Sequence, residues 1–478
     1  MERALSRRRL LASLGTAASV GAVATGTGGA LDGAGDDRAL AAQLAFGWER
    51  TYDDAEQDGL NAVVRLAGGG YAAAGISHPS GGTARPWLVT FDDTGALRWS
   101  RTYTVDGDAE IWDVDTVSGD GYLLVGSLTP GDGSSAVGLL VRVDESGDER
   151  WRRTVPADSG SRLFRGGVET SDGAFAVAGY TNAGGGVDGW VGRFGAGGDT
   201  EWTRSLTLGA ATLPLSVFET VGDDLLVTGT TQPSDGSGNL EGLALSLSAS
   251  GDTQWSQSYV YTSADGTNGY NVLYDVAETT SGYLAVGFSA PTTSADAPHG
   301  WAVATDDAGA PGPNTAVSAG DGTDSLLVAV DRVAGEYALV GQHRNADATN
   351  DWSAWVTGVD GSLARQWTVQ RQVGDSSPLN DGVAASDGGL VAVGRTTDDG
   401  GTTTDGLAMS FDQSESTPPP TPTETATLTP TASPTPTETA SPTPTDTATA
   451  TPTDTATATP TDTATATPTD TATATPSA

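Results

Sequence analysis

One pattern recurs along most of the chain: a short apolar strand that follows a Gly/Asp turn and ends in glycine. Gly70–Gly75 (GYAAAG) and Gly121–Gly126 (GYLLVG) are two examples. The strand-ending glycines lie 50 to 58 residues apart and are Gly75, Gly126, Gly179, Gly229, Gly287, Gly341 and Gly394. A regular period of this length indicates an array of one supersecondary unit, because a single unit cannot bury its apolar face alone. The pattern therefore predicts a repeat fold over residues 44–413.

A tryptophan marks the last strand of most units, after a turn that holds glycine and an acidic residue. The series is Trp48, Trp99, Trp151, Trp202, Trp255 and Trp367. The fifth unit keeps the turn at Gly309, but no tryptophan follows it. We interpret these tryptophans as packing between neighbouring units. The alternative is a platform on which sugars stack, which fits Trp112, Trp352 and Trp355 better because they lie outside the series.

Each unit is predicted to contain four short strands and no helix. In the second unit these strands are Trp112–Val117, Gly121–Leu128, Gly138–Asp144 and Arg150–Val155. Side chains of the two faces alternate along them, and Gly or Asp stands at the hairpin turns, where a positive φ is required. The fold class is therefore all-β. Seven antiparallel four-stranded units at this spacing predict a seven-bladed β-propeller.

The two ends of the repeat region complement each other. Leu44–Tyr52 matches the fourth strand of a unit, whereas Gly406–Phe411 matches a third strand that lacks its own fourth strand. We expect the N-terminal strand to pair with the last blade and so close the ring, which removes two open sheet edges. A solenoid is the rival repeat fold, and it predicts atypical capping units at both ends instead.

The segments outside the repeat differ from it in composition. Residues 1–24 hold a twin-arginine pattern at Arg7 and Arg8, then a short apolar run, which predicts a cleaved Tat signal peptide. Residues 25–43 are predicted to be a linker. Residues 414–478 consist mainly of Thr, Pro and Ala, too few apolar side chains for a core, and predict a disordered stalk. No transmembrane segment is expected in the mature chain.

Charge and cysteine content narrow the classes of partner. The net charge is −38, from 61 acidic residues against 23 basic ones, all of them arginine. That charge argues against nucleic acid and against an anionic membrane surface. It is typical of a protein that works at high salt, where self-repulsion is screened. The absence of cysteine excludes disulfides, thiolate metal sites and a thiol nucleophile.

Three segments carry a resemblance to a known family: Trp99–Tyr103 (WSRTY), Gly179–Thr181 (GYT) and Asp387–Leu390 (DGGL). With the repeat, they resemble secreted seven-bladed β-propeller repeat proteins of bacteria and archaea, of the haloarchaeal type with a Tat signal and a Thr/Pro-rich stalk. The resemblance implies the propeller fold and an extracellular or cell-surface location. Most such proteins have no established activity, so the resemblance implies no reaction.

Propeller ligands usually bind where the innermost strands meet the mouth of the central channel. Polar residues just ahead of or within those predicted strands are therefore the candidate ligand-binding residues. They are Asp113, Arg165, Asp275, Asn380 and Asp381. Asp113 and Asp275 are also candidates for the two carboxylates of a paired-carboxylate glycosidase. No residue is assigned a catalytic role.

The sequence gives little support for a metal or cofactor site. The three histidines, His78, His299 and His343, are expected in variable loops of different units. No cofactor is predicted. The acidic segment Asp106–Asp115 offers the alternate carboxylates that calcium takes, but a chain with 61 acids also carries such clusters on its solvated surface.

The sequence favours a binding module over an enzyme, because no catalytic constellation stands out and no insertion is large enough to build a lid. We expect an exported, salt-adapted propeller at the cell surface or outside the cell that binds a protein or glycan of the envelope. One alternative is a Tat-exported propeller enzyme, either a calcium- and quinone-dependent dehydrogenase or a polysaccharide-active one. The other is a purely structural envelope protein.

Overall fold

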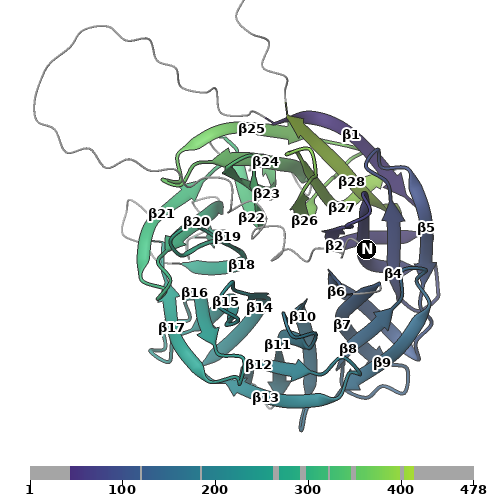
Figure 1. Cartoon of the computed structure of the whole chain (residues 1–478), viewed down its shortest axis with the longest axis horizontal. Helices are drawn as coiled ribbons and strands as arrows, with labels where there is room; N and C mark the ends of the chain where they lie inside the picture. Colours follow the sequence, from purple (N-terminus) through teal and green to yellow (C-terminus); the bar gives the residue numbers. More distant parts are fainter. Residues whose placement is uncertain are drawn as a thin grey trace, which may run out of the picture. The chain divides into compact units, whose positions relative to one another are not determined.

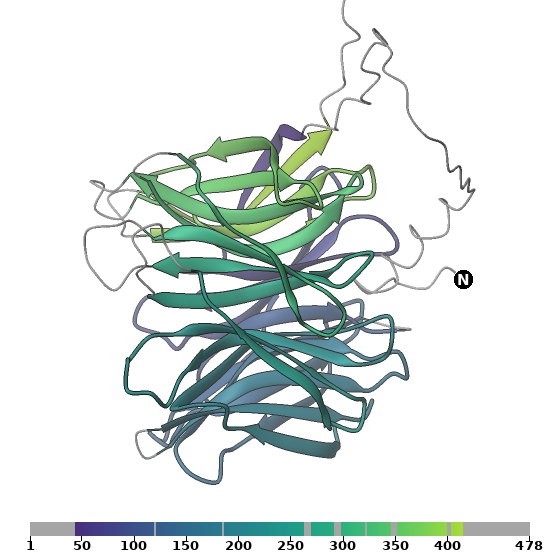
Figure 2. The ribbon, with the colours of Figure 1, turned by 90° about the vertical axis from the view of Figure 1, so that its left-hand side faces the viewer.

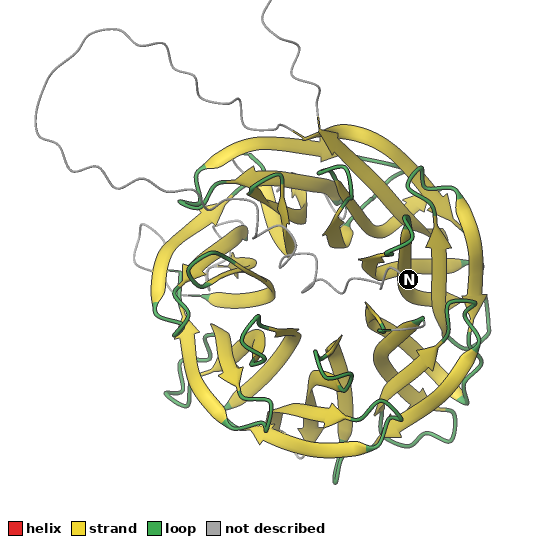
Figure 3. Cartoon of the chain, viewed as in Figure 1, coloured by secondary structure: helices red, strands yellow, loops and turns green. Residues whose placement is uncertain are grey.

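A computed structural model describes residues 44–118, 121–183, 186–261, 269–290, 298–320, 323–345, 351–398 and 403–413. All of these residues belong to one compact unit. The predicted signal peptide, linker and Thr/Pro-rich stalk lie outside the described residues. Within the described residues every regular element is a β-strand (Figure 3). No helix long and apolar enough to cross a membrane occurs in that part of the chain.

The second unit shows how each group of strands is built. β6 (Gly107–Thr116), β7 (Tyr122–Pro130), β8 (Val137–Val143) and β9 (Glu149–Val155) form a four-stranded antiparallel sheet in chain order. The last three strands match the prediction closely. The first begins before the predicted residue, Trp112, and its register explains the difference, as described below.

The same arrangement recurs along the chain. The first group is β2 (Gln57–Arg65), β3 (Tyr71–His78), β4 (Arg85–Phe91) and β5 (Leu97–Thr102). The third and fourth groups are β10 (Ser161–Glu169), β11 (Phe175–Ala183), β12 (Gly186–Phe194) and β13 (Thr200–Leu206), then β14 (Ala211–Glu219), β15 (Leu225–Gln232), β16 (Glu241–Leu247) and β17 (Thr253–Tyr259). The fifth and sixth are β18 (Tyr270–Glu278), β19 (Tyr283–Ala290), β20 (His299–Thr305) and β21 (Pro311–Val317), then β22 (Thr323–Val333), β23 (Glu336–Asn345), β24 (Ser353–Val359) and β25 (Arg365–Arg371).

The last group combines strands from both ends of the described chain. β26 (Leu379–Ala384), β27 (Leu390–Asp398) and β28 (Thr403–Gln413) pair in chain order, and β1 (Leu44–Tyr52) pairs antiparallel with β28. The register runs from Leu44 opposite Gln413 to Tyr52 opposite Gly406. The N-terminal strand therefore lies where the sequence predicted it, beside the last strand (Figure 1).

The groups are arranged around a centre, as in a propeller-like all-β fold. The first strand of each group lies nearest the centre, and the fourth lies at the rim (Figure 1). Neighbouring sheets pack face to face (Figure 2), and the apolar clusters lie between them. One cluster joins Ala74 and Leu88 of the first group to Ile111 and Leu124 of the second. The core is thus divided into layers between adjacent sheets, which leaves the first strands to surround the centre.

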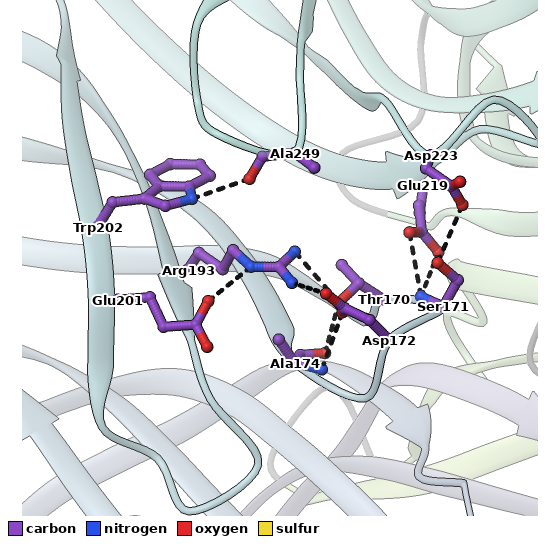
Figure 4. Close-up of polar contacts among 10 residues, drawn as sticks. All are labelled: Thr170, Ser171, Asp172, Ala174, Arg193, Glu201, Trp202, Glu219, Asp223 and Ala249. Atoms are coloured by element: carbon purple, nitrogen blue, oxygen red, sulfur yellow. Dashed lines mark hydrogen bonds and ion pairs between the residues drawn. The ribbon is translucent and has the colours of Figure 1, made fainter.

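The repeated tryptophans lie between neighbouring groups. The indole N–H groups of Trp48, Trp151 and Trp202 donate hydrogen bonds to backbone oxygens of the next group, at 3.1, 3.2 and 3.0 Å. Figure 4 shows the Trp202 bond to Ala249. Trp367 is 5% exposed and lies in the cluster that the sixth and last groups share. Because aromatic rings bury large apolar areas, these contacts hold adjacent sheets together.

Aspartates at the turns between third and fourth strands fix the turn geometry. Asp92 Oδ1 accepts hydrogen bonds from the N–H groups of Thr94 and Ala96, both at 2.9 Å. Asp144, Asp306 and Asp360 accept equivalent bonds two and four residues ahead. An aspartate that accepts from its own turn mimics a backbone turn. These bonds account for the recurrence of the acidic residue in the repeat.

The turn aspartates predict how stability depends on pH. Hydrogen bonds donated within each turn lower the pKa of Asp92, Asp144 and Asp360. A carboxylate whose pKa is lower in the folded chain stabilises the fold above its unfolded pKa, and loses that contribution as pH falls through the folded pKa. Burial raises the pKa of Asp58 and Glu110, so these groups favour folding on mild acidification. We expect the urea midpoint in molar salt to fall steeply below about pH 4.

Substitution by asparagine separates the geometry of these turns from their titration. Asparagine keeps an acceptor oxygen but carries no titrating proton. The triple variant Asp92→Asn, Asp144→Asn and Asp360→Asn should therefore flatten the acid limb of the urea midpoint against pH. An acid limb that keeps its original slope in the triple variant would contradict the assignment.

Candidate functional site

The first strand of every group contains a β-bulge at the same place. In β2, Leu60 pairs with Gly75 and Ala62 pairs with Ala74, so Asn61 is an extra residue between them. The extra residues in the seven first strands are Asn61, Trp112, Arg165, Leu215, Tyr274, Val328 and Asn380. A bulge redirects a side chain out of the regular alternation of the strand.

The seven repeated glycines, expected at strand ends, lie inside the second strands and make these bulges possible. Each glycine pairs with the residue just before the extra one, as Gly75 does with Leu60. A Cβ on any of the seven would lie 1.8 to 2.1 Å from a backbone carbonyl oxygen of the first strand or, for Gly394, of the residue just before it. No side chain tolerates such a contact, so only glycine lets the two strands approach there. The most regular feature of the sequence thus determines the shape of the centre.

The seven bulge residues line one pocket of about 280 Å³ at the centre of the fold. The remaining lining residues are Ala62, Asp113, Ser216, Asp275, Gln342 and Asp381. The structure therefore brings all five sequence-predicted candidates, Asp113, Arg165, Asp275, Asn380 and Asp381, to a single cavity. We call this cavity the central pocket.

Three of the five candidates are aspartates, and they join adjacent first strands. Asp113 accepts a hydrogen bond from the N–H of Gly167 in the next group at 2.8 Å. Asp275 and Asp381 accept equivalent bonds from the first strand of the group that follows each, at 3.0 and 2.9 Å. A buried carboxylate that accepts backbone N–H groups is held by strong, charge-assisted hydrogen bonds. These carboxylates thus stabilise the walls of the central pocket.

The Asp381 bond predicts a large effect of one substitution on stability. Asp381 is 8% exposed and accepts bonds from the N–H groups of Val63, at 2.9 Å, and Gly382, at 2.8 Å. Asp381→Ala leaves both N–H groups without that acceptor and should lower the free energy of unfolding by about 2–4 kcal/mol. Asp381→Asn keeps one acceptor oxygen and should lose about half as much. Urea unfolding in molar salt measures both values, and equal stability of wild type and Asp381→Ala would contradict the role.

Arg165 is the cation of the central pocket. Its guanidinium lies 3.9 Å from the centre of the Trp112 ring and donates a hydrogen bond to the Tyr180 hydroxyl at 3.2 Å. Its buried Nε has no hydrogen-bond partner among the described residues. Burial raises the pKa of Glu110 and of Tyr274, and the positive charge of Arg165 acts against both shifts. Among the residues that line the central pocket, Arg165 carries the one positive charge, alongside the carboxylates of Asp113, Asp275 and Asp381.

The rest of the central pocket combines polar and apolar side chains. The Asn380 amide donates to the Leu60 carbonyl at 2.9 Å, and the Asn61 amide donates to the Ile111 carbonyl at 2.8 Å. Gln342 adds a buried carbonyl oxygen that has no partner in the described part of the chain. Leu215, Tyr274 and Val328, the bulge residues of three successive groups, add apolar surface. A ligand of this pocket would meet both polar and apolar groups.

The other candidates from the sequence are dispersed. The histidines lie in strands and not in variable loops: His78 ends β3, His299 begins β20 and His343 lies within β23. The loop prediction was wrong because the second and third strands extend further than the apolar pattern does. Among the described residues no cluster of three or more metal-ligating side chains occurs. Part of the proposed acidic set, Asp108, instead accepts the N–H of Ala84 at 2.8 Å.

The three tryptophans considered as sugar platforms, Trp112, Trp352 and Trp355, have different environments. Trp355 is completely buried on a third strand, which excludes it as a sugar platform. Trp352 lies beneath Arg344, at 4.7 Å from the guanidinium. Only Trp112 lines the central pocket, where Arg165 covers it.

Comparisons with known proteins give distant similarities in fold. No family model and no curated protein matches the chain. Among solved structures, Sqt1 from Chaetomium thermophilum has a TM-score of 0.40 and 11% identity, and covers 76% of this chain and 100% of its own. The GH32 β-fructofuranosidase BmSUC1 of Bombyx mori has a TM-score of 0.33 and 10% identity, with 78% and 91% covered. A glucose dehydrogenase has a TM-score of 0.32 and 10% identity, with 76% and 98% covered. Similarities at this level carry no argument about function.

Proposed function

We propose that the chain is a seven-bladed β-propeller in which β1 completes the last blade and the ring closes between that blade and the first. The antiparallel pairing of β1 with β28 supports this arrangement. One apolar cluster includes Leu60 of the first group and Val393 of the last. Polar bonds cross the same boundary, from the Val63 N–H to Asp381 and from the Asn380 amide to the Leu60 carbonyl.

On that fold, the proposed function is binding of a small carboxylate-bearing ligand in the central pocket. The observation that carries the proposal is the Arg165 guanidinium, which is held on the Trp112 ring and has an unpartnered buried Nε. A planar guanidinium suits a carboxylate because it presents parallel N–H donors. The pocket, at about 280 Å³, is near the lower end of the usual size range for ligand sites.

The proposed setting is the cell surface or the exterior of a cell that lives at high salt, reached through the Tat pathway. Arg7, Arg8 and the Thr/Pro-rich residues 414–478 support export and a stalk. The net charge of −38 supports adaptation to salt. At molar salt the Debye length is about 3 Å, so an anionic ligand can approach this acidic chain. Acidic glycans and acidic peptides of the envelope carry the required carboxylates.

An enzyme is the weaker candidate. A paired-carboxylate glycosidase needs two carboxylates free to donate a proton and to attack or activate water. Asp113 and Asp275 instead accept backbone N–H bonds between first strands. Their engagement favours a structural role, so a binding module explains the central pocket better than a hydrolase does.

A thermal-shift experiment on the full chain in molar salt tests the proposal. Galacturonate and glutamate should raise the melting temperature, whereas their neutral counterparts galactose and glutamine should not, because a ligand stabilises the state that binds it. Arg165→Gln should abolish the difference. Arg204→Gln is the matched control, since Arg204 lies over Trp202 at the rim. Equal shifts from acids and neutral molecules, or a shift that Arg165→Gln retains, would contradict the proposal. A parallel series with calcium and chelator tests whether the acidic segments bind calcium.

A further inference from the structure

Five tryptophans of the repeated series occupy matching sites between neighbouring groups. Each lies over the glycine of the next group's turn between third and fourth strands. The pairs are Trp48 with Gly95, Trp99 with Gly147, Trp151 with Gly198, Trp202 with Gly251 and Trp255 with Gly309. A Cβ on any of these glycines would meet the indole ring at 2.6 to 3.1 Å. An aromatic residue at the start of the second strand often completes the site. Trp99, for example, lies 6.3 Å from Tyr122, and Trp255 lies 6.2 Å from Tyr283.

The site between the fifth and sixth groups lacks its tryptophan. In β21, Pro311 pairs with Thr305 and Asn314 with Val303. Comparison with the register between β4 and β5 in the first group shows that Pro313 of β21 stands at the position of Trp99 in β5. The next turn also departs from the others, because Leu363, with φ 64°, stands where the other turns have glycine. Of the six equivalent turn positions, only the one at the site without a tryptophan holds a residue other than glycine.

A pocket of about 370 Å³ lies at this place. Its lining includes Leu284, Pro313, Tyr337 and Leu363, with Asp306 among its polar groups. Tyr337 pairs with Val359 as Tyr122 pairs with Val143 in the second group. Tyr337 is therefore equivalent to the aromatic residues that contact the tryptophan at occupied sites. Tyr337 has no aromatic ring partner in the described part of the chain. We call this cavity the seam pocket.

We propose that the seam pocket binds the tryptophan side chain of a protein partner. The five occupied sites show what the surrounding surfaces accept, and the seam pocket exceeds the cavity of about 150 Å³ that holds benzene in an engineered protein. In four occupied sites an arginine follows the tryptophan two residues later: Arg50, Arg101, Arg153 and Arg204. In β21 that place holds Thr315. Asp306 at the pocket and the charge of −38 favour a partner segment of the type Trp-x-Arg.

Titration of the full chain with the peptide acetyl-Trp-Gly-Arg-amide, followed by the melting temperature in molar salt, tests the proposal. The peptide should raise the melting temperature, and acetyl-Ala-Gly-Arg-amide should not. Free 5-fluoroindole, observed by fluorine NMR, reports on the ring alone. Binding of 5-fluoroindole without binding of the peptide would overturn the assignment to a protein partner. Absence of binding by both probes would overturn the site.

Two filled variants assign the binding to the seam pocket. Pro313→Trp combined with Leu363→Gly recreates an occupied site, and should raise the melting temperature while weakening peptide binding at least about tenfold. Leu363→Trp fills the pocket from the opposite wall. It replaces the double variant in the peptide-binding test if the double variant does not fold. Peptide binding that survives in a folded filled variant would overturn the proposal.

Two further variants complete the design. Trp255→Gly opens an equivalent cavity against Gly309, so it should bind 5-fluoroindole at a second site and shows that the assay detects such a cavity. Arg165→Gln should leave peptide binding unchanged. The seam pocket and the central pocket share no lining residue, so failure of one proposal leaves the other standing.

Discussion

Deletion of Leu44–Tyr52 is expected to abolish the cooperative unfolding of the protein. The deleted strand, β1, pairs with β28 over its length and contributes the buried side chains of Leu44 and Tyr52. The Tyr52 hydroxyl also donates to the Gly95 carbonyl of the first group at 2.9 Å. Burial of these side chains and the lost strand pairing together amount to about 5 kcal/mol or more, which is comparable with the whole stability of many domains. The deletion further exposes the edge of β28, which invites aggregation.

Circular dichroism during thermal unfolding in molar salt measures the effect of the deletion. Glu49→Gln is the control within the same strand. It removes an exposed ion pair with Arg371, whose Nε lies 2.9 Å from the Glu49 carboxylate, and should change stability by less than about 1 kcal/mol. A deleted chain that melts as sharply and at the same temperature as the wild type would show that β1 does not hold the last and first groups together.

The repeat pattern predicted the strands better than it predicted where the first strand of each unit begins. In the second unit the first strand was expected to start at Trp112, whereas β6 starts at Gly107. The bulge at Trp112 explains the error. It adds one residue between Ile111 and Asp113, so the alternation of buried and exposed side chains changes phase there. The two parts of β6, before and after Trp112, therefore do not form one continuous alternating pattern in the sequence.

The five candidate residues line the central pocket because they were chosen on the innermost strands, which surround it. Their role in ligand binding stays a prediction. The chemistry of the chosen residues depends on partners that only the strand arrangement supplies. The sequence offers Asp381 as a free carboxylate, whereas the fold uses it to accept the N–H of Val63.

The apolar residues that line the central pocket were missed altogether. Leu215, Tyr274 and Val328 are ordinary strand residues by composition, and nothing in their type marks them as ligand contacts. A positional signal does exist. Each comes directly after the residue that pairs with one of the seven repeated glycines. Leu215, for example, follows Pro214, which pairs with Gly229. This signal can be recognised only when the register between the first and second strands is known, and the repeat alone does not determine that register.

Substitution at one of the seven repeated glycines should destabilise the fold as much as a large core mutation does. A Cβ on Gly75 would lie 2.0 Å from the Gly59 carbonyl oxygen and 2.9 Å from the Leu60 Cα. Both contacts are with backbone, so no side-chain rotation relieves them, and the strands must separate at the bulge. We expect Gly75→Ala to lower the free energy of unfolding by about 3 kcal/mol or more. The same displacement moves Asn61, so the loss of stability should come with a changed central pocket.

Gly68 provides the matched comparison in the same group. A Cβ there would meet nothing within 4 Å, and its backbone does not have a positive φ. Gly68→Ala should therefore leave stability unchanged or raise it by up to about 1 kcal/mol, since alanine restricts the unfolded chain. Urea unfolding of both variants in molar salt gives the two free energies. If Gly75→Ala proves as stable as Gly68→Ala, the close approach of strands at the bulge is not what requires glycine. The glycine period would then need an explanation that does not involve the central pocket.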